Sequence, residues 1–69
     1  MKKLLIIGAN PETISLIEKA KLMGLKTYVT DYNKITYAKK FADVPCYVDG
    51  MDVDGLVGLV KKENIDCVL

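Results

Sequence analysis

Residues 3–13 read KLLIIGANPET and carry the strongest structural signal in the chain. Their first part, residues 3–9, is an apolar run without alternation, which is typical of a parallel strand covered on both faces. Asn10 is a good helix N-cap, Pro11 is favoured at the first helical position, and Glu12 suits the positive end of the helix dipole. The stretch therefore predicts a buried strand that turns directly into a helix.

The helix that starts here is expected over residues 11–23, because Gly24 is a typical helix stop. Its apolar face is predicted from residues at helical spacing, namely Leu16, Ile17, Ala20 and Met23. Residues 26–32, KTYVTDY, are rich in β-branched and aromatic side chains and predict a second strand. A strand, a helix and a second strand thus fill the first half of the chain.

The second half continues the alternation. A short helix is expected over residues 34–42, with an apolar face made of Ile35, Ala38, Phe41 and Ala42. Residues 46–48 predict a third strand, and Pro45 at its start favours a position at a sheet edge. A helix is expected from an Asp52 N-cap to Asn64, and residues 66–69 open a fourth strand.

Strands that alternate with helices through short connections indicate an α/β fold, in which a parallel sheet lies between helices. Right-handed crossovers then place the first strand in the centre, so we expect a three-layer, Rossmann-like sheet with strand order 3-2-1-4. The chain stops inside its fourth apolar strand. The sequence is therefore expected to be an incomplete domain, truncated at strand four, with more sheet to follow.

Length, composition and charge narrow the classes of function. A chain of 69 residues has a marginal core. All ten basic residues are lysines and the net charge is +1, so neither a nucleic-acid footprint nor a basic stripe for a membrane surface is expected. The N-terminal apolar run falls short of a secretory signal, and no segment approaches the length of a membrane span. The sequence predicts a cytoplasmic protein.

Residue types that often carry chemistry are scarce. The chain has no histidine, and its two cysteines, Cys46 and Cys67, cannot form a zinc site alone. We expect both cysteines to be small core residues rather than nucleophiles or a disulfide pair. Asp49, Asp52 and Asp54 are better explained by a turn and a helix cap than by a metal. The lysine pairs at 39–40 and 61–62 are expected on solvated helix faces.

The candidate ligand site is the loop Gly8-Ala9-Asn10-Pro11-Glu12-Thr13. It lies where a dinucleotide fold places Gly-x-Gly-x-x-Gly, but Asn10 and Thr13 replace the second and third glycines. Pro11 removes one N–H group and Glu12 would repel a phosphate. A phosphate site and a plain, well-capped turn both stay open.

Asp31, at the end of the second strand, is the remaining candidate for ligand binding. It stands where NAD enzymes hold a ribose hydroxyl, but aspartate is also a common turn former. The residue alone does not decide between these two roles.

Four segments together resemble a known family: the Gly8–Thr13 loop, KAKLMGLKTYVTDY, YAKKFAD and DVDGLVGLVKKENIDCVL. In order and spacing they are similar to the N-terminal, Rossmann-like pre-ATP-grasp domain of ATP-grasp ligases. The nearest resemblance is to the carbamoyl-phosphate synthase large-subunit-like group, and it covers essentially the whole chain. By this resemblance residues 1–69 are an incomplete pre-ATP-grasp domain from which the ATP-grasp core is absent.

The resemblance implies an ATP-dependent carboxylate–amine ligase as the parent protein. Its ATP, magnesium and catalytic residues would lie beyond Leu69, so that the 69 residues alone have no cofactor and no activity. In several relatives the first loop lines the acceptor site, which here corresponds to Asn10, Pro11, Glu12 and Thr13. The expected ligand of the parent is a small molecule.

Two other functions stay open at this point. One is a nucleotide- or NAD-binding Rossmann module of an oxidoreductase, and the other is a regulatory or interaction module without a small ligand. The missing glycines count against the first of these. Because the outer edge of strand four would be unpaired, a homodimer through that edge is a further expectation.

Overall fold

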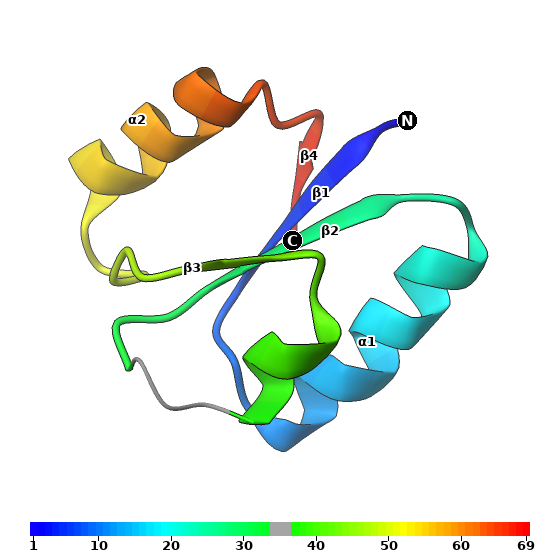
Figure 1. The fold of residues 1–69 in the computed structure, drawn as a ribbon. Helices are drawn as coiled ribbons and strands as arrows, with labels where there is room; N and C mark the ends of the chain where they lie inside the picture. The colour runs from blue at the N-terminus through cyan, green and yellow to red at the C-terminus, as the bar shows by residue number, and fades with distance from the viewer. Residues whose placement is uncertain (34–36) are drawn as a thin grey trace.

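The computed structural model describes residues 1–33 and 37–69 of the chain. Strands and helices alternate through these residues, with a short 3-10 helix in the middle (Figure 1). Their bounds in chain order are β1 (Lys3–Ile7), α1 (Pro11–Leu22), β2 (Lys26–Thr30), the 3-10 helix η1 (Tyr37–Phe41), β3 (Val44–Cys46), α2 (Val53–Glu63) and β4 (Cys67–Val68).

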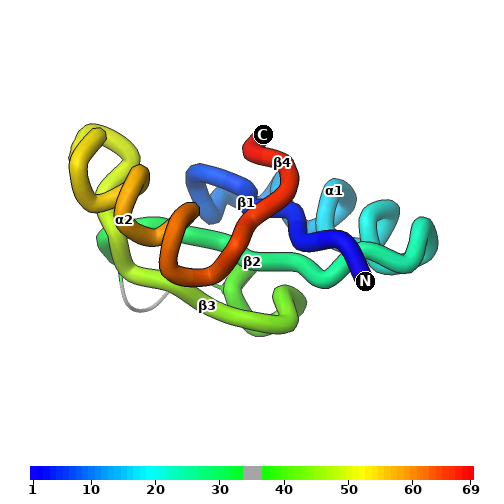
Figure 2. Tube along the Cα trace, turned by 90° about the horizontal axis from the view of Figure 1, so that it is seen from above, coloured from blue at the N-terminus to red at the C-terminus, as the bar shows by residue number. Residues whose placement is uncertain are grey.

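The four strands form one parallel sheet in the order β3-β2-β1-β4, which confirms the predicted topology. β1 pairs with β2 along its full length, from Lys3 opposite Lys26 to Ile7 opposite Thr30. On its other side β1 pairs with the short β4, which runs beside it in both Figure 1 and Figure 2. The apolar first strand is therefore central, as its unbroken apolar run predicts.

Alternate residues of β1 supply two separate cores. Leu4 and Ile6 pack with Ile17 and Ala20 of α1, and Phe41 of η1 covers the same cluster. Leu5 lies in a second cluster on the other face with Tyr28 and Cys46, against which Leu59, Val60 and Ile65 pack. α1 and α2 accordingly lie on opposite sides of the sheet (Figure 1), and the molecule is a three-layer, Rossmann-like α/β structure.

The apolar face predicted for the first helix is partly wrong. Ile17 and Ala20 are buried, but Leu16 is half-exposed and Met23 is 75% exposed. The reason is that α1 ends at Leu22 and Met23 is its C-cap, where the backbone has left the helical path. Thr13 takes the place expected of Leu16, because the buried stripe runs through positions 13, 17 and 20.

The bounds of β2 and β3 also differ from expectation. β2 ends at Thr30 rather than at residue 32, and β3 covers Val44–Cys46 rather than residues 46–48. Pro45 lies inside β3 opposite Val29, and β3 forms an edge of the sheet, where a residue without an N–H is tolerated. The predicted helix over residues 34–42 is the 3-10 helix Tyr37–Phe41, while residues 34–36 lie outside the described residues.

Both long helices are capped as the sequence predicts. The Asn10 side chain accepts a hydrogen bond from the N–H of Thr13, and the Asp52 side chain accepts one from the N–H of Gly55. Asn64 ends α2 in the left-handed conformation, with φ 56°. These side chains satisfy N–H groups that the first turn of a helix leaves without intrahelical partners.

The two cysteines have different environments. Cys46 is buried, as expected, and burial raises the pKa of its thiol. Cys67 is exposed, which contradicts the expected core position, because β4 forms the edge of the sheet and both of its residues stay accessible. Both thiols are free.

Among the described residues, no helix has the length and apolar character needed to cross a membrane.

Candidate functional site at the carboxyl ends of the strands

The order of the strands marks one place on the sheet where a ligand is expected. The chain winds from β1 through β2 to β3 in one direction, and α2 then carries it back to β4 on the other side of β1. The direction of winding therefore reverses between β1 and β4. In open α/β sheets, ligands bind outside the carboxyl ends of the strands at such a switch point.

An open cavity of about 310 Å³ lies at this switch point. The carboxyl end of β1 meets there the start of α1 and the residue after β4. The lining residues are Ile6, Ile7, Asn10, Glu12, Thr13, Leu16 and Leu69. The cavity thus combines apolar side chains with two neutral polar groups, and Glu12 brings a negative charge.

The loop after β1 begins with a glycine that the backbone requires. Gly8 has φ +99°, a conformation that residues with a side chain rarely adopt, and its N–H donates to the carbonyl of Thr30 over 2.9 Å. The tight turn of the glycine loop therefore exists although the second and third glycines are replaced. The Gly8 N–H is hydrogen-bonded to the carbonyl of Thr30 and is therefore not free to bind a ligand.

The rest of the loop is held by hydrogen bonds that its own side chains make. The Oδ1 atom of Asn10 accepts from the Thr13 N–H over 3.2 Å, and the Thr13 hydroxyl lies 3.0 Å from the Gly8 carbonyl and 3.1 Å from Asn10 Oδ1. Pro11 has no N–H to offer. These contacts favour a well-capped turn and leave few donors for a phosphate.

Asp31 ties this loop to the end of β2. Its Oδ2 atom accepts from the Ala9 N–H and its Oδ1 atom accepts from the Asn33 N–H, each over 3.0 Å. The Asn33 bond, the Ala9 bond and the nearby Lys39 ammonium lower the pKa of Asp31 below its ordinary value, so the side chain is a carboxylate at neutral pH. Oδ1 therefore serves the turn after β2, as a turn-forming aspartate does, while Oδ2 holds the loop after β1.

The predicted site residues take three different places. Asn10, Glu12 and Thr13 line the cavity. Gly8 and Asp31 are not among the lining residues, but they hold the loop through the carbonyl of Thr30 and the N–H of Ala9. Pro11 is exposed at the first position of α1 and is not among the lining residues.

Lys39 contradicts the expectation of a solvated face. It is only 5% exposed, and its ammonium donates to the carbonyls of Asp31 and Asn33 over 2.7 and 2.5 Å. The expectation assumed the period of an α-helix, whereas η1 is a 3-10 helix with three residues per turn. No local sequence signal marks Lys39 as buried, because its carbonyl acceptors follow a different strand.

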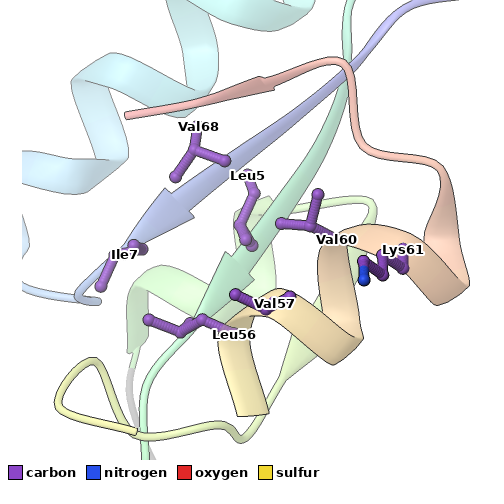
Figure 3. A pocket seen from close by; sticks show the side chains of 7 residues that line it. All are labelled: Leu5, Ile7, Leu56, Val57, Val60, Lys61 and Val68. Atoms are coloured by element: carbon purple, nitrogen blue, oxygen red, sulfur yellow. The ribbon is translucent and has the colours of Figure 1, made fainter. Parts of the chain in front are cut away.

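A second open cavity, of about 290 Å³, lies between α2 and the sheet. Figure 3 shows Leu56, Val57 and Val60 on α2 facing the side chains of the strands. Those strand residues are Leu5 and Ile7 of β1 and Val68 of β4, and Lys61 completes the lining. We call this second cavity the α2 groove. It is apolar apart from Lys61.

The aspartates after β3 have structural tasks. Asp49 Oδ1 accepts from the Met51 N–H over 3.0 Å, and Asp52 caps α2. Gly55 is needed beside this cap, because a Cβ there would lie 2.5 Å from an oxygen of Asp52. The turn-and-cap explanation of Asp49 and Asp52 is confirmed. In the part of the chain that the structure describes, no group of three or more histidine, cysteine or acidic side chains could hold a metal ion.

No protein-family model matches the chain, and no curated protein matches it. The likeness to the pre-ATP-grasp domain thus stays a prediction from sequence.

Proposed function

We propose that this chain is the N-terminal, substrate-side domain of an ATP-dependent carboxylate–amine ligase of the ATP-grasp superfamily, similar to carbamoyl-phosphate synthase. The observation that supports the proposal best is the switch-point cavity, into which Asn10, Glu12 and Thr13 of the first loop are turned. In this proposal the cavity holds part of the acceptor substrate, and the reaction takes place outside the 69 residues.

The hydrogen bonds of the loop support an acceptor site over a site for a pyrophosphate. The N–H groups of Gly8, Ala9 and Thr13 already have acceptors within the chain, and Pro11 has no N–H group. Glu12 adds a negative charge where a phosphate would lie. The cavity suits a small molecule whose neutral or cationic polar group meets Glu12 and whose apolar part meets Ile6, as an amine-bearing acceptor would.

The proposal assigns ATP, magnesium and the catalytic residues to further parts of the protein. The hydrogen bonds of the first loop support this assignment, because its Ala9 and Thr13 N–H groups are used within the chain. The proposal also places the protein in the cytoplasm, with which the free thiols of Cys46 and Cys67 agree.

A nucleotide- or NAD-binding Rossmann module is the second candidate. Two observations favour it: the left-handed Gly8 at the tight turn and the position of Asp31 at the carboxyl end of β2. The bonds from Ala9 and Asn33 to the Asp31 carboxylate oppose it, because a ribose hydroxyl would compete with both.

The proposed function is tested on the product of the complete open reading frame. We expect it to release ADP from ATP only when a carboxylate and an amine are both present. Glu12→Gln should raise the KM of the amine at least about tenfold, the weight of roughly one charged hydrogen bond. Glu18→Gln, on the exposed side of the same helix, should leave that KM unchanged.

Three results would count against the proposal. One is a complete product that does not hydrolyse ATP under any pair of substrates, and another is an equal effect of Glu12→Gln and Glu18→Gln. Hydride transfer with NAD would favour the second candidate instead.

A further inference from the structure

The buried side chain of Lys39 places its ammonium between the loops that follow β2 and β3. Its Nζ atom donates to the carbonyls of Asp31 and Asn33, which follow β2. The same atom lies 4.1 Å from the centre of the Tyr47 ring, which follows β3. A charge that is withdrawn from water is tolerated only where such partners replace the water.

Asp31 links Lys39 to the loop after β1. Its backbone carbonyl accepts from Lys39, while its carboxylate accepts from the Ala9 N–H. Ala9 directly precedes Asn10, the first residue of the loop that lines the switch-point cavity. One continuous set of contacts therefore runs from Tyr47 through Lys39 and Asp31 to the wall of the candidate site.

We propose that Lys39 is a positioning residue, which holds the loops after β1, β2 and β3 in one arrangement and thereby fixes the wall of the switch-point site. The relevance to substrate binding rests on the proposed function, but the coupling of the three loops does not. The carbonyls of residues 31 and 33 both accept from the Lys39 ammonium, so a side chain without a donor would remove one hydrogen bond from each.

The protonation of Lys39 agrees with this role. Burial lowers the pKa of the Lys39 ammonium, and the negative charge of Asp31, followed by the Cys46 side chain, opposes that shift. The charge of Asp31 thus supports the cation whose hydrogen bond holds the Asp31 backbone. Asp31 favours the charged form of Lys39, and Lys39 favours the carboxylate form of Asp31.

Amide hydrogen exchange tests the proposal without any ligand. Lys39→Met keeps an unbranched side chain, shorter by one heavy atom, and removes the charge. In this variant the Ala9 amide should exchange at least about tenfold faster, relative to the Lys26 amide, than in the unchanged chain. Lys26 is the internal reference, because its N–H donates to Lys2 over 2.8 Å at the opposite end of the same two strands.

Two further variants complete the experiment. Lys40→Met, at the exposed neighbouring lysine, should change the ratio of Ala9 to Lys26 exchange by less than about twofold. Lys39→Arg keeps the charge and should restore part of the protection at Ala9. If Lys39→Met does not fold, the arginine variant decides. The exchange rate of Ala9 relative to Lys26 should then be at least about threefold higher in Lys39→Arg than in the unchanged chain, because a planar guanidinium does not fit both carbonyls and the ring equally well.

Equal acceleration at Ala9 and Lys26 would show a loss of global stability only and would overturn the proposal. An effect of Lys40→Met as large as that of Lys39→Met would do the same. The exchange rates are measured without substrate. A negative result would therefore refute the role of Lys39 alone, whereas the Glu12→Gln assay tests the proposed function.

Discussion

The backbone N–H of Ala9 donates a 3.0 Å hydrogen bond to the Oδ2 atom of Asp31, and this bond joins the carboxyl ends of β1 and β2. It forms next to the first loop, where the sequence places its ligand candidates. The bond gives Asp31 a structural task that its position in the chain does not reveal. Its strength should depend on pH, because only the carboxylate accepts from both Ala9 and Asn33 at once.

Asp31→Asn should lower the free energy of unfolding by about 1–2 kcal/mol at pH 7, toward the low end for hydrogen bonds to a charged group because the side chain is only partly buried. Because folding lowers the pKa of Asp31, its contribution is fully present above the unfolded value of about 3.9 and is lost as the pH falls through the folded pKa. Urea unfolding of both proteins across this acidic range measures the difference. Glu18→Gln is the control, and a stability gap for Asp31→Asn that persists at the acid end would contradict the prediction.

Gly8→Ala should destabilise the protein by about 1–3 kcal/mol through backbone strain, because φ at this position is +99° while the space for a Cβ is open. Gly58→Ala is the matched control. That glycine lies inside α2 with equally open space, so alanine there should stabilise the protein by about 0.5–1 kcal/mol. Thermal unfolding of the two variants should give shifts of opposite sign, and a stabilising Gly8→Ala would show that the turn adapts.

The 69-residue chain should bind neither ATP nor NAD usefully. Most of the first-loop N–H groups are already hydrogen-bonded, and Glu12 opposes an anion. Calorimetric titration measures this directly. A dissociation constant near about 1 μM, equivalent to roughly −8 kcal/mol, for either nucleotide would refute the prediction and support the oxidoreductase alternative.

The edge at β4 should make the 69-residue chain either dimeric or poorly stable. Cys67, Val68 and Leu69 are exposed, and β4 forms the border of the sheet. Val68→Lys should therefore shift sedimentation toward a monomer, whereas Leu22→Lys, at an exposed apolar residue at the end of α1, should not. A well-folded monomer at tens of micromolar, with an ordinary cooperative urea transition, would contradict this prediction.

The order of the strands can be predicted from the apolar run and the alternation of strands and helices in the sequence. The apolar run after Lys3 predicts a central strand, and the alternation with helices restricts the crossovers, so the sequence alone predicts the strand order 3-2-1-4. Asn10 and Asp52 act as caps because capping depends on residues only three positions apart. Such local signals are readable in one sequence.

The rest depends on contacts that no local pattern carries. Lys39 is buried because the segment around it winds as a 3-10 helix, and its carbonyl partners follow a different strand. Met23 is exposed because the helix ends one residue earlier than its apolar spacing suggests. The candidate cavity needs Leu69 beside Ile7, a pairing that appears only when β4 lies next to β1.

The larger core has a consequence for how the chain folds. All its buried members come from a single βαβ unit spanning residues 3–30, and they are Leu4, Ile6, Ile17, Ala20 and Val29. Their contacts close short loops, which form faster than distant pairings. We therefore expect a transition state in which β1, α1 and β2 are already associated, with high φ-values at Ile17 and Val29. α2, which has no fully buried residue, and β4 would join afterwards, so substitutions there should change the unfolding rate more than the folding rate.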